Sequence, residues 1–171
     1  LRVREAVESA AVLQHLDEIA QSGLQFIWQT GKYYHDQIAE RLKASGKPDN
    51  LVVCDFIADM TAAYRADDLV ISRAGASSIS EFCLIGMPVI LVPSPNVAED
   101  HQTKNAMALV NHDAALYVKD SEATEKLIAL AIATVADDSR LASLHENILK
   151  LALPNSAEII AKEVIKLAEQ V

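Results

Sequence analysis

The sequence predicts an α/β domain in which a mostly parallel sheet is flanked by helices. Short apolar, β-branched runs alternate along the chain with amphipathic stretches, the pattern of βαβ units. With 171 residues, 51% of them hydrophobic, the chain is long enough for one domain with a substantial core. The same composition excludes intrinsic disorder. We therefore expect a single domain over residues 1–171, without internal repeats or a dividing linker.

Each expected element follows from its local pattern. Strands are predicted where short apolar runs occur: 25–28, 51–54, 69–72, 89–92 and 115–118. Helices are predicted between them, over 5–21, 33–44, 58–65, 77–85 and 100–110. The rest is predicted to be a helical tail over 121–136, 138–152 and 156–169. We expect the chain to open on a helix, without the strand and glycine-rich turn that usually begin a doubly wound nucleotide domain.

Charge and cysteine content narrow the class of protein. The 15 basic and 24 acidic residues give a net charge of −9, a poor match for a nucleic acid or an anionic membrane surface. Cys54 and Cys83 lie in apolar runs without metal-ligand spacing, which favours buried thiols in a reducing compartment. No apolar stretch approaches the roughly 18 residues that a spanning helix needs. We expect a cytoplasmic protein that does not bind nucleic acid.

The segment Ser72–Glu81 is the densest candidate site. It joins a predicted buried strand to a helix, so it lies at the carboxyl edge of the sheet, where open α/β sheets bind ligands. Small residues and serines surround the helix start, where free N–H groups and the helix dipole suit a phosphate. The dipole disfavours Arg73 there unless an anion or a carboxylate pairs with it. The Ser-x-x-Glu pattern at 78–81 equally fits a capping box, which needs no ligand.

Two further segments follow strands that end at the same edge. Residues 99–105 (Glu-Asp-His-Gln-Thr-Lys-Asn) do not favour a metal site, because contiguous residues rarely converge on one ion. Gln102, an uncharged donor and acceptor, suits sugar hydroxyls better. In residues 55–60 an apolar side chain either has exposed backbone groups beside it that can bind the edge of a planar base, or fills a space in the core. Residues 29–32 are expected to be a turn.

Other familiar site patterns are missing from the sequence. There is no dinucleotide fingerprint, P-loop, nucleophile elbow or Cys/His metal spacing. Four histidines are expected to lie on the surface without partners: His15, His35, His112 and His145. We therefore expect neither a nucleophile nor a set of metal ligands in this chain.

Taken together, these segments resemble the donor-binding half of a GT-B glycosyltransferase. The resemblance is closest to the MurG family, which adds N-acetylglucosamine to an undecaprenyl-linked muramyl-pentapeptide. It covers about residues 13–170 and implies a Rossmann-like parallel sheet, the C-terminal half of a GT-B fold, with a helical C-terminal tail. The motifs that carry it are Trp28–Lys32, Phe56–Met60, Ser72–Glu81, Gly86–Pro88 with Val92-Pro93, and Glu99–Ala106.

The family implies a role for each matching position. Ile57 would bind the uracil through its backbone, Glu81 would bond the ribose hydroxyls, and Gln102 would contact hydroxyls of the N-acetylglucosamine ring. The helix start would face the diphosphate. Val3-Arg4-Glu5 resembles the end of the family's interdomain segment, whose arginine, here Arg4, would lie near the nucleotide. The residues implied to line the nucleotide sugar are Ala76, Ser77, Ser78, Ile79, Ser80 and Glu81.

The resemblance also implies a reaction. It is an inverting transfer from UDP-N-acetylglucosamine (UDP-GlcNAc) to lipid I, the undecaprenyl-diphosphate-linked muramyl-pentapeptide, in peptidoglycan synthesis. Preorganised backbone donors, without an obligatory metal or other cofactor, would stabilise the leaving diphosphate. We expect no catalytic residue in this chain, because the family's general base lies in its acceptor-binding half. The full-length enzyme would be peripheral to the cytoplasmic face of the bacterial inner membrane, with lipid I and membrane contacts made by that half.

The chain departs from the family pattern at its front. The acceptor-binding half is absent, as are the family's first strand and its phosphate-cradling glycine loop, so we expect a fragment that is inactive alone. Three alternatives remain open. They are another GT-B enzyme of UDP sugars (a glycolipid transferase or a UDP-GlcNAc 2-epimerase), a binding subunit that needs a membrane partner, and a domain with capped helices and no ligand.

Overall fold

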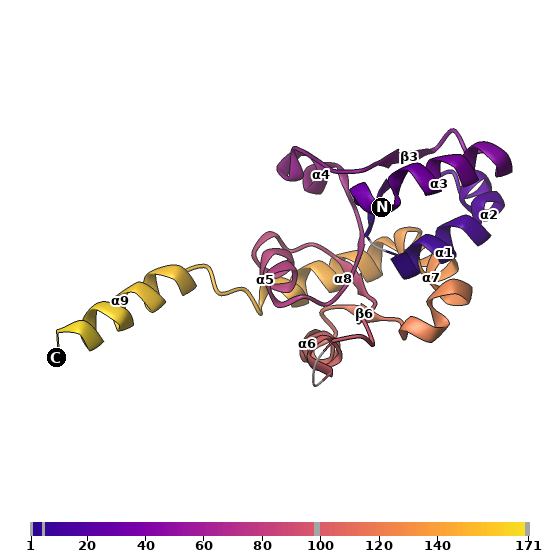
Figure 1. Cartoon of the computed structure of the whole chain (residues 1–171). Coiled ribbons are helices and arrows are strands. Elements are labelled where there is room, and N and C mark those ends of the chain that lie inside the picture. The colour runs from indigo at the N-terminus through magenta and orange to yellow at the C-terminus, as the bar shows by residue number, and fades with distance from the viewer. Residues whose placement is uncertain (1, 5, 98–99, 170–171) are drawn as a thin grey trace.

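One parallel sheet organises the chain. The computed structural model describes residues 2–4, 6–97 and 100–169, with backbone alone for 2–4 and 6–8 (Figure 1). Its strands pair in the order β3-β2-β1-β4-β5-β6, all parallel, which confirms the predicted class. The strands are β1 Arg2–Arg4, β2 Phe26–Gln29, β3 Leu51–Cys54, β4 Val70–Ser72, β5 Val89–Leu91 and β6 Leu116–Tyr117.

Helices cover both faces of the sheet. Alternate side chains of the central strands point to opposite faces, so Ile71 packs into one core cluster and Val70 into the other. Helices α1, α2, α3 and α7 contribute to the first cluster, and α5, α6 and α8 to the second. The helices are α1 Ala6–Gln14, α2 Leu16–Gln21, α3 Lys32–Ser45, α4 Met60–Ala66, α5 Ala76–Ile85, α6 His101–Val110, α7 Asp120–Val135, α8 Asp138–Leu149 and α9 Ser156–Ala168.

The start of the chain corrects one prediction. We expected a helix there and no first strand, but Arg2–Arg4 forms β1 in the middle of the sheet. Val3 pairs with Trp28 of β2, and Arg2 also pairs with Val70 of β4. A strand here satisfies backbone groups of β2 and β4 that would otherwise be buried without partners. The strand could not be predicted, because three residues, two of them charged, are too few to show the alternation of apolar and polar side chains.

The histidines correct a second prediction. The helix expected over 5–21 is interrupted at His15, whose ring lies 2.9 Å from both Glu18 Oε2 and the Thr124 carbonyl oxygen of α7. His35 Nδ1 lies 3.2 Å from Thr30 Oγ1, and His145 Nδ1 donates to the Gly86 carbonyl at 2.6 Å. His112 and His145 are exposed as expected, but three of the four histidines (His15, His35 and His145) have hydrogen-bond partners, which the sequence did not predict.

The two cysteines differ. Cys83 is buried in the second core cluster, and burial raises the pKa of its thiol, which confirms the expectation for this residue. Cys54 is only half-buried at the end of β3.

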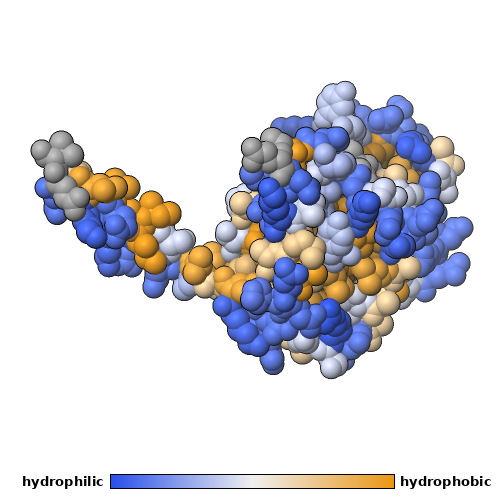
Figure 2. Space-filling view, turned by 90° about the horizontal axis from the view of Figure 1, so that it is seen from below, coloured by the Kyte–Doolittle hydropathy of each residue, from blue (hydrophilic) through white to orange (hydrophobic). Residues whose placement is uncertain are grey.

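Helix α9 extends away from the sheet (Figure 1), and none of its residues is buried. Apolar side chains gather along one side of it and polar ones along the other (Figure 2). Its exposed large apolar side chains are Ile159, Ile160, Val164, Ile165 and Leu167. Among the described residues, no helix is long and apolar enough to span a bilayer. The predicted helical tail is confirmed.

We predict that Gly86→Ala destabilises the fold more than Gly23→Ala. Both glycines have positive φ, +68° and +72°, so alanine is strained at either position. Only at Gly86 would a Cβ meet other atoms, 2.6 Å from His145 Cε1 and 2.9 Å from Leu149 Cγ of α8. Urea unfolding should show an additional loss of about 1–3 kcal/mol in the free energy of unfolding. Equal losses for the two variants would contradict the predicted clash.

A second prediction concerns acid stability. Arg140 of α8 binds both carboxylate oxygens of Asp113 at 2.9 Å, and this hydrogen bonding lowers the pKa of that carboxyl. A lowered pKa stabilises the fold above the ordinary aspartate value of about 4, and the contribution is lost as pH falls through the lowered value. Asp113→Asn should therefore reduce the loss of unfolding free energy between about pH 5 and pH 2. Asparagine tolerates the φ of +53° at this position, and 1 M salt should shrink the difference.

Candidate functional site

The polar segments singled out from the sequence meet at one edge of the sheet. Because all six strands are parallel, the loops after them lie at the same carboxyl edge. The strand order reverses between β1 and β4, and open α/β sheets bind ligands in the crevice at such a point. The segment 73–75 leaves β4 at this crevice and leads directly into α5.

Helix α5 begins at this edge without a side-chain cap. Its N-cap is Gly75, in extended conformation, and no side chain of the described residues caps it. The first intrahelical bond runs from Ile79 N to Gly75 O, so the N–H groups of 76–78 have no partner within the helix. The capping-box interpretation of 78–81 is therefore wrong, because the helix starts three residues before the pattern requires.

Glu81 lies in the second turn of α5, with its side chain exposed. Tyr64 of α4 donates its hydroxyl to Glu81 Oε2 at 2.8 Å. The Tyr64 ring packs edge-on against Phe82, with 6.2 Å between ring centroids. The carboxylate therefore has a defined partner on a neighbouring helix, and the backbone of its own helix supplies none.

Arg73, beside the start of α5, pairs with a carboxylate, which is one of the two conditions under which a cation was expected there from the sequence. Its Nη1 donates to Asp120 Oδ1 at 2.5 Å and to the Val92 carbonyl at 3.1 Å. The two side chains are only 12% and 21% exposed. The carboxylate of α7 offsets the repulsion between the guanidinium and the positive end of the α5 dipole. The ion pair joins the loop after β4 to the start of α7, and the bond to Val92 joins it to the residue after β5.

Two amides of α6 hold the loop that leads into α5. Gln102 Oε1 accepts the N–H of Ala74 at 3.3 Å and the N–H of Ser94 at 2.9 Å. Asn105 Nδ2 donates to the Ala74 carbonyl at 3.1 Å. Both polar groups of Ala74 are thus bound by one helix. The oxygen of Gln102 is engaged with the backbone, which leaves its Nε2 group as the donor for a ligand.

The loop after β3 lies at the same edge. Phe56 is 61% exposed and Ile57 is half-buried, and within the described chain Ile57 is not among the side chains packed against either core cluster. Plugging the core is therefore not its role. Asp59 ends the loop by accepting the N–H of Ala62 at 2.9 Å, which caps α4.

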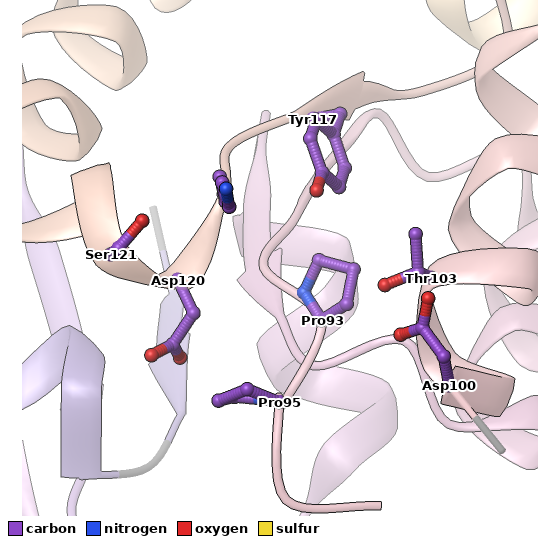
Figure 3. A pocket seen from close by; sticks show the side chains of 8 residues that line it. Pro93, Pro95, Asp100, Thr103, Tyr117, Asp120 and Ser121 are labelled. Atoms are coloured by element: carbon purple, nitrogen blue, oxygen red, sulfur yellow. The ribbon is translucent and has the colours of Figure 1, made fainter.

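A pocket of about 360 Å³ lies next to the Gln102 contact, between the loops after β5 and β6 (Figure 3). Ser94, which Gln102 binds, stands between two prolines of its wall. The volume of this pocket falls within the range of small-molecule sites, about 300–1,000 Å³. The side chains that line it are Pro93, Pro95, Asp100, Thr103, Tyr117, Lys119, Asp120 and Ser121.

The structure brings most of the predicted site residues to one edge. The helix start at 76–81, Ile57 and Gln102 all lie on loops or first turns that follow strands of the sheet. Arg4 ends β1 at this edge, while its side chain, like all of Glu99, lies outside the described residues. No group of three or more His, Cys, Asp or Glu side chains in the described part of the chain could hold a metal ion.

Sequence reasoning missed the residues that hold the site together. Tyr64 and Asp120 were not singled out, and Asn105 was named only as part of the segment 99–106, without a role; they bind Glu81, Arg73 and Ala74 respectively. Asp120 could have been found by the rule that located the other loops, since it follows a short strand at its carboxyl end. Tyr64 lies within a helix, and no local pattern distinguishes it from an ordinary surface tyrosine.

The sheet order, the crevice between β1 and β4 and the uncapped helix define an open α/β domain, a class in which ligands are generally bound at the carboxyl edge of the sheet. Residues 4–164 match the glycosyltransferase family 28 C-terminal domain, and the chain belongs to this family.

Similar proteins agree with this assignment. A Bacteroides thetaiotaomicron protein named UDP-N-acetylglucosamine–N-acetylmuramyl-(pentapeptide) pyrophosphoryl-undecaprenol N-acetylglucosamine transferase is 70% identical over 146 residues, 85% of this chain and 39% of its own length. A Porphyromonas gingivalis protein of the same name is 49% identical over 160 residues, 93% of this chain and 42% of its own. The crystal structure of Acinetobacter baumannii MurG superposes with a TM-score of 0.77 at 26% identity, covering 97% of this chain and 52% of that one. The predicted fold, the C-terminal half of a GT-B glycosyltransferase, is confirmed, and the chain spans about two fifths of these two relatives.

We predict that Asp120→Ala destabilises the chain by about 2 kcal/mol, because the mostly buried Arg73 guanidinium loses this carboxylate. Glu122→Ala, two residues along α7, is the matched control. It removes an exposed pair with Lys126, which is screened by solvent and should contribute little to stability. Urea unfolding of both variants measures the difference. Equal small losses would show that the Arg73 pair does not hold the loop.

Proposed function

We propose that this chain is the donor-binding part of an inverting N-acetylglucosaminyltransferase. In the proposed reaction, N-acetylglucosamine passes from UDP-GlcNAc to lipid I, which yields lipid II for peptidoglycan synthesis. The observation that carries the proposal is the uncapped start of α5 at the sheet's carboxyl edge, with Glu81 on its second turn. The names of relatives up to 70% identical supply the donor sugar and the lipid-linked acceptor.

The proposed donor lies along the edge from β3 toward β5. The backbone at Ile57 binds the uracil, and Glu81 accepts the ribose hydroxyls. The N–H groups at 76–78 face the diphosphate, and Gln102 Nε2 contacts the sugar ring. The exposed loop after β3, the free first turn of α5 and the fixed Gln102 amide support this order. The side chains of Ser77, Ser78 and Ser80 complete the proposed lining, and Arg4, at the end of β1, is proposed to lie near the nucleotide.

The chemistry requires little from this chain beyond binding and electrostatics. A hydroxyl of the acceptor sugar attacks the anomeric carbon, and the bond from that carbon to the diphosphate oxygen breaks with its electron pair going to UDP. The N–H groups and dipole of α5 stabilise the charge that develops on the leaving diphosphate. We propose that this makes a metal ion dispensable. A base outside this chain removes the proton of the attacking hydroxyl.

The acceptor is proposed to meet the donor from the part of the enzyme that this chain does not contain. That part also makes the contact with the membrane, on the cytoplasmic face where the lipid-linked acceptor is held. The net charge of −9 supports this division, because an acidic domain is repelled by anionic lipids.

Calorimetry with UDP-GlcNAc tests the proposal. Glu81→Ala should weaken binding about 10- to 100-fold, since hydrogen bonds to a charged group contribute about 1.5–3 kcal/mol. Glu158→Ala is the matched control, because Glu158 lies near the start of α9 and pairs with Lys162 away from the sheet. Unchanged affinity in Glu81→Ala would show that Glu81 does not contact the donor, and no binding by the wild-type chain would favour a domain without this ligand. A preference for UDP-glucose or UDP-galactose over UDP-GlcNAc would point to a different UDP-sugar enzyme.

A further inference from the structure

We propose that Tyr64 is a positioning residue that makes the site prefer ribose over deoxyribose, by orienting the carboxylate of Glu81 toward the sugar hydroxyls. This inference rests on the proposed function, in which Glu81 accepts those hydroxyls. The contact that carries it is the hydrogen bond from the Tyr64 hydroxyl to Glu81 Oε2 at 2.8 Å.

The Glu81 carboxylate needs such a partner. Its side chain is exposed on α5, and an exposed glutamate loses considerable rotamer freedom when a ligand fixes it. A carboxylate has about four acceptor positions on two oxygens. The tyrosine hydroxyl occupies one of them on Oε2, and no hydrogen bond to Oε1 is found in the described part of the chain. A vicinal diol can therefore donate to the remaining positions of a carboxylate that is already oriented.

Tyr64 is itself held in place by the core. Its ring is half-buried and packs against the second core cluster. There it meets the ring of Phe82, only 1% exposed, at an interplanar angle of 89°. The Tyr64 hydroxyl is thus held relative to α5 by the contact of its ring with Phe82, the residue that follows Glu81.

The same tyrosine connects the two proposed nucleoside contacts. It lies on α4, whose N-cap Asp59 ends the loop that contains Ile57. The loop proposed to bind the base and the carboxylate proposed to bind the ribose are therefore joined through one short helix. This geometry makes the spacing between base and ribose contacts a property of the fold, set before the ligand arrives.

Binding of UDP and of 2′-deoxy-UDP, measured by calorimetry on the 171-residue chain, tests the inference. The wild-type chain should prefer UDP. Tyr64→Phe keeps the ring packing and should weaken UDP binding about three- to tenfold, the effect of leaving one side chain to be ordered by the ligand. It should change 2′-deoxy-UDP binding by less than about twofold, so the preference narrows.

A double variant and a control variant complete the test. In the Glu81→Ala background, adding Tyr64→Phe should change UDP affinity by less than about twofold, because no carboxylate is left for the tyrosine hydroxyl to orient. Tyr33→Phe removes the hydroxyl of an exposed tyrosine and should leave both affinities unchanged.

The outcomes separate the inference from the function on which it rests. If the wild-type chain prefers UDP and Tyr64→Phe leaves that preference unchanged, the inference is overturned and the proposed function stands. An equal loss for both nucleotides, with a lowered melting temperature, indicates a purely structural tyrosine and also overturns it. If the wild-type chain binds no UDP, the proposed function fails and the inference fails with it.

Discussion

The site depends on how the backbone of one residue, Ala74, is held by hydrogen bonds. Gln102 accepts its N–H and Asn105 donates to its carbonyl, so α6 fixes the point where the chain leaves β4 for α5. The direction in which α5 presents its first N–H groups follows from that point. Without these two bonds, buried backbone groups at the crevice would lack partners, which costs more than an ordinary hydrogen bond contributes. The pairing of Arg73 with Asp120 supports the same loop from the other side.

The hydrogen bonds that hold the start of α5 are made to Ala74, before the helix begins, and not to the first N–H groups of the helix. A helix start is ordinarily satisfied by its own side-chain cap. At α5 the stabilising bonds are made one residue earlier, to Ala74, and the N-terminal N–H groups remain available. Serine side chains nearby do not consume them, since Ser80 bonds back to the Ala76 carbonyl. A helix anchored by its neighbours can therefore keep its positive end open to an anion.

Much of the fold could be predicted because its signals are local. Apolar runs placed β3, β4 and β5, and the helices of the tail were found from their periodicity. Strand β1 was not predicted, because three residues are too few to show an alternating pattern. Its place in the sheet comes from pairing with β2 and β4. The break at His15 was missed for the same reason, since its ring bonds a residue more than one hundred positions away.

The sequence by itself determined the α/β class, the edge at which the polar segments gather, and the candidates Ile57, Glu81 and Gln102. It could do so because parallel strands bring every strand end to one edge. The tertiary structure alone excluded the capping-box interpretation of 78–81, since the true start of α5 depends on how the loop at Ala74 is bound. It also revealed Tyr64, Asn105 and Asp120 as the partners that hold the site. Such contacts join residues far apart in the chain, and no local pattern records them.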